Sequence, residues 1–362
     1  MGRKPGRELR RGWTTGACAA AATGAAYAAL LTGAFPDPVT VRLPGGERPS
    51  FPLAERALAA DRATAAVVKD AGDDPDVTHG ALVRATVRRL PAGAGVAFRA
   101  GEGVGTVTLP GLPVPVGEPA INPAPRAMMR AVIAELAAAH GDSGDVEVTV
   151  AIPGGLELAR RTMNGRLGIE GGLSVLGTTG VVIPYSCASW IHAIHRGIDV
   201  ARAIGLTHVA AATGSTSERA VQAMYGLPET ALIDMGDFVG GTLKYLRRHP
   251  IPRLTLAGGF AKLTKLAQGH LDLHSGRSSV DVDALAALLA ETGAPAGALD
   301  AARGAATANQ LLQLAGDSGR RLGDAVADRA RRTALERLDG RTAVEVLAFD
   351  REARLVGRAA GW

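Results

Sequence analysis

Cysteine and aromatic residues are scarce in this 362-residue sequence, and each shortage limits the kinds of structure that the chain can form. The two cysteines, Cys18 and Cys187, lie far apart, so we expect no disulfide framework and a reducing, cytoplasmic compartment. Phe, Trp and Tyr together make up 4% of the chain, while Ala and Gly are abundant. This balance predicts closely packed backbones and many turns.

Long hydrophobic runs are missing as well. The best candidate for a membrane span, residues 17–31, is too short, is rich in Ala and is interrupted by Gly24. The first residues carry positive charge but are not followed by an apolar core of the kind found in secretory signals. We therefore expect no membrane partner.

Lysine is almost absent: five Lys accompany 35 Arg, and the formal net charge is +5. A GC-rich coding bias is sufficient to explain this surplus, although guanidinium groups could also bind the carboxylates of an anionic ligand. The basic residues are dispersed, and no nucleic-acid-binding motif accompanies them. Nucleic acid is therefore not expected as a partner.

The pattern of the sequence changes near residue 145, which predicts two domains. Residues 1–145 combine short strands, Gly and Pro turns and two helical stretches, the second at residues 123–141, and this predicts an α+β domain. Residues 146–362 repeat strand, glycine turn and helix, which predicts a parallel α/β sheet covered on both faces. We expect a linker at residues 141–145, helices over residues 281–338 and a terminal hairpin that turns at residues 350–352.

Glycine and polar residues follow the strands of the predicted second domain. Open α/β sheets bind ligands outside the carboxyl ends of their strands, where helix N-termini offer free N–H donors. This pattern favours a nucleotide-like cofactor, but neither a Walker A sequence nor G-x-G-x-x-G is present to indicate ATP or NAD. The candidate binding residues are Thr213, Gly214, Ser215, Thr216, Asp234 and Asp237.

The stretch VVKDAGDDPDVTHG, residues 67–80, places four carboxylates directly after an apolar run: Asp70, Asp73, Asp74 and Asp76. A solvated turn and a functional loop both remain open as interpretations. The spacing does not fit an EF-hand. Thr14 and Thr15 precede the first helix, where a capping role would be sufficient.

Cys187, His192 and His195 could suggest a metal site, because the two histidines share one helix face. Further ligands are missing at the usual spacing, so we expect polar packing and no metal.

Five unusual stretches carry a resemblance to a known family. They are LRRGWTTGACAAAATGAA, VVKDAGDDPDVTHG, GEGVGTVTLPGLPVPVGEPAINPAPRAMM, TMNGRLGIEGGLSVLGTTGVVIPYS and LAGGFAKLTKLAQGHLDLHS, between residues 9 and 274. Together they resemble the CbiD family, the cobalt-precorrin-5B (C-1)-methyltransferases of cobalamin biosynthesis. The resemblance implies methyl transfer from S-adenosylmethionine to ring carbon C-1 of a small-molecule tetrapyrrole, with cobalt only as part of the substrate. It also implies a Rossmann-like three-layer α/β/α fold for residues 146–362.

Methyl transfer gives the candidate residues roles, because the cofactor carries the reactivity and the protein supplies orientation. The four Asp side chains of the loop would steady a cation or act as a general base, with Thr14 and Thr15 completing the catalytic set. S-adenosylmethionine is expected against residues 213–216 and 234–237, with Gly177, Thr178 and Thr179 as the second candidate site. A non-catalytic corrinoid or cobalt carrier remains the alternative function, and a homo-oligomer remains open.

Overall fold

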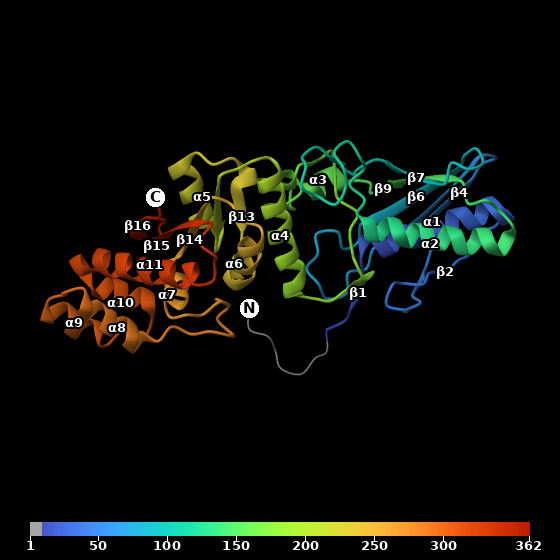
Figure 1. The fold of residues 1–362 in the computed structure, drawn as a ribbon. Coiled ribbons are helices and arrows are strands. Elements are labelled where there is room, and N and C mark those ends of the chain that lie inside the picture. Colours follow the sequence, from blue (N-terminus) through green and yellow to red (C-terminus); the bar gives the residue numbers. More distant parts are fainter. Residues whose placement is uncertain (1–8) are drawn as a thin grey trace. The chain divides into compact units, whose positions relative to one another are not determined.

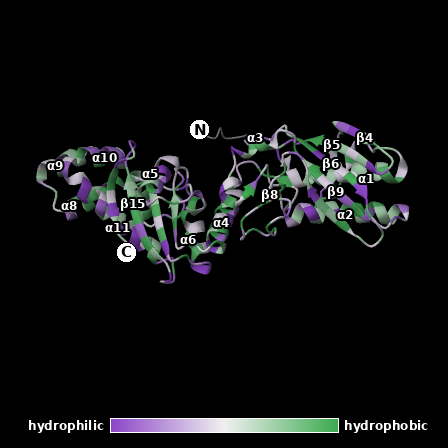
Figure 2. Ribbon diagram, turned by 90° about the horizontal axis from the view of Figure 1, so that it is seen from above, coloured by the Kyte–Doolittle hydropathy of each residue, from purple (hydrophilic) through white to green (hydrophobic). Residues whose placement is uncertain are grey.

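The computed structural model describes residues 9–362, and contacts divide the chain into two compact units (Figure 1). The first unit is Met1–Ser186 and the second is Cys187–Trp362. In Figure 2 the strands, such as β15, are largely green, while purple hydrophilic segments lie mostly on the helices and loops. Each unit has its own hydrophobic core.

The first unit is built on a five-stranded sheet with the order β4-β5-β6-β9-β7. Its pairs are antiparallel except for β7 and β9, which are parallel. Alternate side chains of β6, including Val83, Ala85 and Val87, are buried because one face of the sheet packs against helices. The strands are β4 (Glu55–Leu58), β5 (Arg62–Val68), β6 (Leu82–Arg89), β7 (Val96–Ala100) and β9 (Val146–Ala151).

Helices α1 (Thr15–Thr32) and α2 (Pro123–His140) lie side by side in the first unit (Figure 1). Small residues allow this approach: a Cβ on Gly16 would meet Pro125 Cγ at 2.7 Å, and one on Gly24 would meet Val132 Cγ2 at 2.9 Å. Among the described residues, α1 alone is long and apolar enough to pass a membrane-span test, but 83% of it is buried. It is the central core helix of this unit.

Three small two-stranded ladders and short helices complete the first unit. The ladders join β1 (Gly12–Trp13) to β11 (Val181–Val182), β2 (Val39–Thr40) to β3 (Ser50–Phe51), and β8 (Thr106–Val107) to β10 (Ile169–Glu170). The short helices are α3 (Gly155–Ala159) and η1 (Gly165–Leu167).

The structure corrects the predicted domain boundary after residue 145. Strand β9 was assigned to the second domain, but it pairs with both β6 and β7 and buries Val146, Val148 and Val150 in the first core. The predicted linker is an ordered turn, in which Asp142 accepts a hydrogen bond from Tyr27 Oη at 2.6 Å. Partners distant in the sequence decide the position of β9.

The second unit contains a five-stranded sheet with the order β13-β12-β14-β15-β16. The first four strands are parallel, and β16 returns antiparallel to β15. From β12 the chain moves to one side to form β13, then crosses back to form β14 and β15 on the other side. The strands are β12 (His208–Ala212), β13 (Leu232–Asp234), β14 (Arg253–Gly259), β15 (Ala343–Phe349) and β16 (Leu355–Ala359).

Helices cover both faces of this second sheet. Val221 of α5 packs with Ala210 and Leu347 on one face, while helices including α4, α6, α7 and α11 bury their apolar residues on the other. The helices are α4 (Cys187–Ala203), α5 (Ser215–Tyr225), α6 (Val239–Arg248), α7 (Phe260–Ala267), α8 (Val282–Glu291), α9 (Ala296–Ala302), α10 (Ala308–Leu314) and α11 (Gly319–Leu335), with short turns η2 (Glu229–Ala231) and η3 (Gly316–Ser318). The predicted mixture of α+β and α/β structure, the helical region and the terminal hairpin are confirmed.

Candidate functional site

Three segments that are distant in the sequence meet in the first unit: residues 10–16, 69–80 and 176–185. Backbone hydrogen bonds join them, from Trp13 N to Asp70 O at 2.7 Å and from Thr14 N to Gly180 O at 2.9 Å. Glycine makes the contact possible, since a Cβ on Gly177 would lie 2.2 Å from Thr14 Cβ. The predicted catalytic residues and Gly177, Thr178 and Thr179 are therefore brought together.

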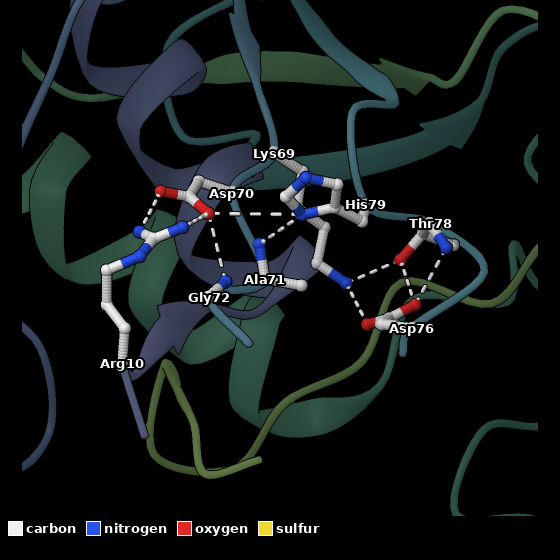
Figure 3. Close-up of polar contacts among 8 residues, drawn as sticks. All are labelled: Arg10, Lys69, Asp70, Ala71, Gly72, Asp76, Thr78 and His79. Carbon is white, nitrogen blue, oxygen red and sulfur yellow. Dashed lines mark hydrogen bonds and ion pairs between the residues drawn. The ribbon is translucent and has the colours of Figure 1, made fainter. Parts of the chain in front are cut away.

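Arg10 and Asp70 form a bidentate ion pair at this junction (Figure 3). Arg10 Nη2 donates to Asp70 Oδ1 at 2.9 Å, and Gly72 N donates to the same oxygen at 2.9 Å. The hydrogen bond from Arg10 is the largest cause that lowers the pKa of Asp70, to about 2. A carboxylate that binds protons so weakly is a poor general base near neutral pH.

Lys69 is a buried member of this loop that sequence analysis missed. Its side chain is 3% exposed, and its Nζ contacts both Asp76 and Thr78 (Figure 3). Burial acts to raise the pKa of Asp76, but Lys69 and Thr78 outweigh it, so that this pKa lies below its usual value. The sequence does contain a signal for this buried lysine. Lys69 directly follows an apolar run and precedes Asp70, in a chain with five lysines.

The other two carboxylates also have partners within the protein. Asp73 Oδ2 accepts a hydrogen bond from Arg10 N at 2.8 Å, and Asp74 Oδ1 accepts one from Tyr185 N at 2.8 Å. Asp70, Asp73 and Asp74 thus join the three segments, and Asp76 holds the loop itself. Their catalytic roles stay predictions.

The threonines at this junction have local structural roles. Thr14 is the N-cap of α1, and its Oγ1 accepts a hydrogen bond from Ala17 N at 3.2 Å. Thr15 is buried in the first turn of α1. Thr179 Oγ1 accepts from Val181 N at 3.2 Å, and Thr178 and Thr179 are exposed.

A pocket of about 470 Å³ lies at the carboxyl edge of the sheet in the second unit. It follows the ends of β12, β14 and β15, and it lies where the strand order reverses between β12 and β14. Pockets of this volume and position hold small-molecule cofactors in open α/β sheets. The lining residues are Thr213, Gly214, Ser215, Thr216, Ser217, Gly259, Phe260, Ala261, Lys262, Asn309, Phe349, Asp350 and Arg351.

The pocket favours an anionic group. The N-termini of α5 and α7 both face it, and Lys262 and Arg351 add two cations. Its carboxylate, Asp350, already accepts hydrogen bonds from Arg354 through both oxygens. Residues 213–216 were predicted from the sequence, whereas Lys262, Asn309 and Arg351 were not, because they come from distant segments.

Asp234 is the last residue of β13 and Asp237 follows the strand, and neither lines the pocket. Asp237 is linked to it through Lys262, whose Nζ lies 3.0 Å from Asp237 Oδ1 and donates to Thr213 O at 3.0 Å. Asp237 does not cap the next helix, because Phe238 is the N-cap of α6. Asp237 therefore orients a lysine of the pocket.

Of the residues that suggested a metal site, Cys187 and His192 are exposed on α4 and His195 is half-buried. His195 stacks on Tyr245 with ring centroids 3.8 Å apart, whereas His192 is 6.4 Å from His195. Burial is the main cause that lowers the pKa of His195. Within residues 9–362, no group of three His, Cys, Asp or Glu side chains is placed to hold a metal ion.

Comparison with known proteins gives matches over nearly the whole chain. The family model CbiD matches residues 2–184, next to the division after Ser186, and the model "CbiD, C-terminal domain" matches residues 272–360. A Bradyrhizobium protein named cobalt-precorrin-5B C(1)-methyltransferase is 62% identical over 98% of this chain and 95% of its own. Proteins of the same name from Agrobacterium fabrum and Paramagnetospirillum magneticum are each 59% identical, over 98% and 97% of this chain and 93% and 98% of their own.

A solved structure also matches. It is the crystal structure of a cobalamin biosynthesis protein (cbiD) from Archaeoglobus fulgidus, at 25% identity and a TM-score of 0.40, covering 70% of this chain and 77% of that one.

Proposed function

The chain belongs to the CbiD family, and from this premise we propose that it methylates ring carbon C-1 of cobalt-precorrin-5B to give cobalt-precorrin-6A in cobalamin biosynthesis. The observation that carries the proposal is the 62% identity, over 98% of the chain, to a protein named for this reaction. The methyl donor we propose is S-adenosylmethionine. It supplies an electrophilic methyl group on a positively charged sulfur, so the protein has to bind and orient the reactants.

We place the donor in the pocket of the second unit and take that unit to be Rossmann-like. In support, its strand order reverses between β12 and β14, the position at which such sheets bind nucleotides. First-turn N–H groups of α5 lack intrahelical acceptors and could receive the methionine carboxylate, together with Lys262 and Arg351. Asn309 is available to the ribose or the adenine.

Two glycines of the pocket further support a ligand there. A Cβ on Gly214 or on Gly259 would meet no protein atom within 4 Å. Gly214 is also fully extended, with φ 167° and ψ 166°, a backbone that any residue adopts. The fold therefore does not require glycine at either position. Close approach of a ligand would require it, because a side chain would occupy the same space.

Gly214→Val tests the donor site with little risk to folding. We expect it to weaken binding of S-adenosylhomocysteine at least tenfold by calorimetry, which is about 1.4 kcal/mol. Gly304→Val is the matched control, because a Cβ there also meets no atom within 4 Å and the residue lies outside the pocket. If Gly214→Val binds as tightly as the parent, the donor site lies elsewhere, and residues 177–179 become the next candidate.

The reaction itself is tested by incubating the protein with cobalt-precorrin-5B and S-adenosylmethionine. We expect a product heavier by one methylene unit in mass spectrometry. A carrier would bind the tetrapyrrole and leave its mass unchanged.

A further inference from the structure

Exposed apolar side chains gather on one segment of the first unit. Leu176, Ile183 and Tyr185 have 49%, 56% and 67% of their surface exposed. All three belong to residues 176–185, which are fixed to the start of α1 by the β1–β11 ladder and by a hydrogen bond from Gly16 N to Leu176 O. We call these three side chains the ledge. Apolar side chains gathered in one exposed segment indicate an interaction surface.

Tyr185 is held in an unfavourable backbone conformation. Its φ is 57°, in the left-handed region that residues other than glycine rarely adopt. Such a residue is strained and persists where surrounding contacts impose it, often at functional sites. The contact here is the hydrogen bond from Tyr185 N to Asp74 Oδ1. Asp74 thus fixes the direction of an exposed aromatic side chain.

A cation lies beside the ledge. In the antiparallel β1–β11 ladder Gly12 is opposite Val182, so Arg11, directly before β1, and Ile183, directly after β11, lie at the same end of the ladder. Arg11 is exposed, and its guanidinium has no ion-pair or hydrogen-bond partner within residues 9–362. An unpaired guanidinium is suited to a carboxylate.

We propose that the ledge binds one flat face of the tetrapyrrole, that Arg11 binds a carboxylate of its rim, and that Asp74 is a positioning residue for Tyr185. This inference rests on the proposed function, which supplies a macrocycle with broad apolar faces and a carboxylate rim. The ledge and Arg11 match both features, because aromatic and aliphatic side chains pack on ring faces while the guanidinium pairs with acid groups. Arg10, its neighbour, is already paired with Asp70, whereas Arg11 has no such partner among the described residues.

Tetrapyrrole binding is measured directly, by the quenching of intrinsic fluorescence on titration with cobalt-precorrin-5B, so the test does not depend on turnover. We expect Tyr185→Ala to weaken tetrapyrrole binding at least tenfold and to leave S-adenosylhomocysteine binding unchanged. Ala has a Cβ as Tyr does, so the left-handed backbone at residue 185 is equally strained in the parent and in Tyr185→Ala. Tyr185→Phe should bind like the parent because it retains the ring. Leu58→Ala is the control, since Leu58 is 46% exposed in the same unit.

Two substitutions at Asp74 separate positioning from charge. Asp74→Asn retains an oxygen that accepts from Tyr185 N and should bind the tetrapyrrole like the parent, whereas Asp74→Ala should resemble Tyr185→Ala. If Asp74→Ala binds the tetrapyrrole as tightly as the parent while Tyr185→Ala does not, the positioning role is wrong. Loss of turnover in Asp74→Asn at unchanged tetrapyrrole affinity would show that the charge of Asp74 has a separate role in the reaction.

Two results would overturn the ledge itself. One is unchanged tetrapyrrole affinity in both Tyr185→Ala and Tyr185→Gly. The other is a change of oligomeric state in sedimentation velocity without any change in tetrapyrrole affinity, which would make the ledge a contact between two copies of this chain. The two proposals can fail separately. If the parent protein binds the tetrapyrrole through the ledge but does not methylate it, the proposed reaction is wrong and the proposed binding role of the ledge is supported.

Discussion

Lys69 shows how much one charged residue contributes to the junction of the first unit. Its side chain is 3% exposed, against 23% for its partner Asp76. Removing one member of a buried ion pair costs about 3–5 kcal/mol, because the other charge is left uncompensated. We expect Lys69→Met to lower the free energy of unfolding by about 3 kcal/mol in urea denaturation, the lower end of that range, since Asp76 still reaches water.

Lys244→Met is the matched control for this substitution. Lys244 is exposed on α6 and should change stability by less than about 0.5 kcal/mol. Equal effects of the two substitutions would show that the buried pair contributes nothing.

Acid stability depends on two other carboxylates of the first unit. The pKa of Asp70 is lowered from 3.8 to about 2 mainly by Arg10, and that of Asp142 is lowered from 3.8 to about 2 mainly by Tyr27 and then Arg89. Their folded-state pKa lies below the unfolded value, so the stability they contribute is present above about pH 4 and is lost as the pH falls toward 2.

We expect the melting temperature to decline over this window, and to decline less in a protein carrying both Asp70→Asn and Asp142→Asn. Thermal melts at successive pH values measure the slope. A slope that is identical in parent and variant would rule out these two groups as its source.

At the scale of elements, α11 and β16 are joined by a pair of glycines. A Cβ on Gly323 would lie 1.8 Å from Val356 O, and one on Gly357 would lie 2.1 Å from Gly323 O. Two backbones approach too closely here for any side chain. Gly323→Ala should therefore cost about 3 kcal/mol or more in chemical denaturation, even though Ala favours helix, because backbone atoms cannot move aside as side chains do.

The control is Gly297→Ala in α9, where a Cβ meets no atom within 4 Å. It should be neutral or slightly stabilising, by up to about 0.5 kcal/mol. If Gly323→Ala behaves in the same way, α11 and β16 are not in close contact.

Local elements could be predicted from the sequence, whereas long-range pairings could not. The successions β12–α5, β13–α6 and β14–α7 were predicted correctly, because each glycine turn joins neighbouring segments. Strand β9 has the same local pattern, yet it pairs with β6 and β7, and nothing in its own residues distinguishes the two sheets. The same holds for the residues of the pocket. Residues 213–216 could be predicted because they directly follow a strand in the sequence. Arg351 could not, because only the pairing of β14 with β15 brings it to the pocket.

At the scale of the whole molecule, the two cores predict which fragments fold. A fragment of residues 1–186 retains the complete first sheet and should unfold cooperatively, as monitored by circular dichroism in urea. A fragment of residues 1–145 lacks β9, which lies between β6 and β7, and should show no cooperative transition. Cooperative unfolding of the shorter fragment would restore the boundary first predicted near residue 145.

The position of β15 also sets an order in time. Synthesis at about 5–20 residues per second leaves roughly 9–35 s between the addition of residue 186 and that of residue 362. The first unit can complete its sheet in that interval. The second cannot, because β15 pairs with β14 from the last twenty residues of the chain and closes the pocket with Phe349 and Arg351. Until β15 has been added, the edge of β14 stays open, so the nascent chain is exposed at that edge to pairing with strands of other proteins.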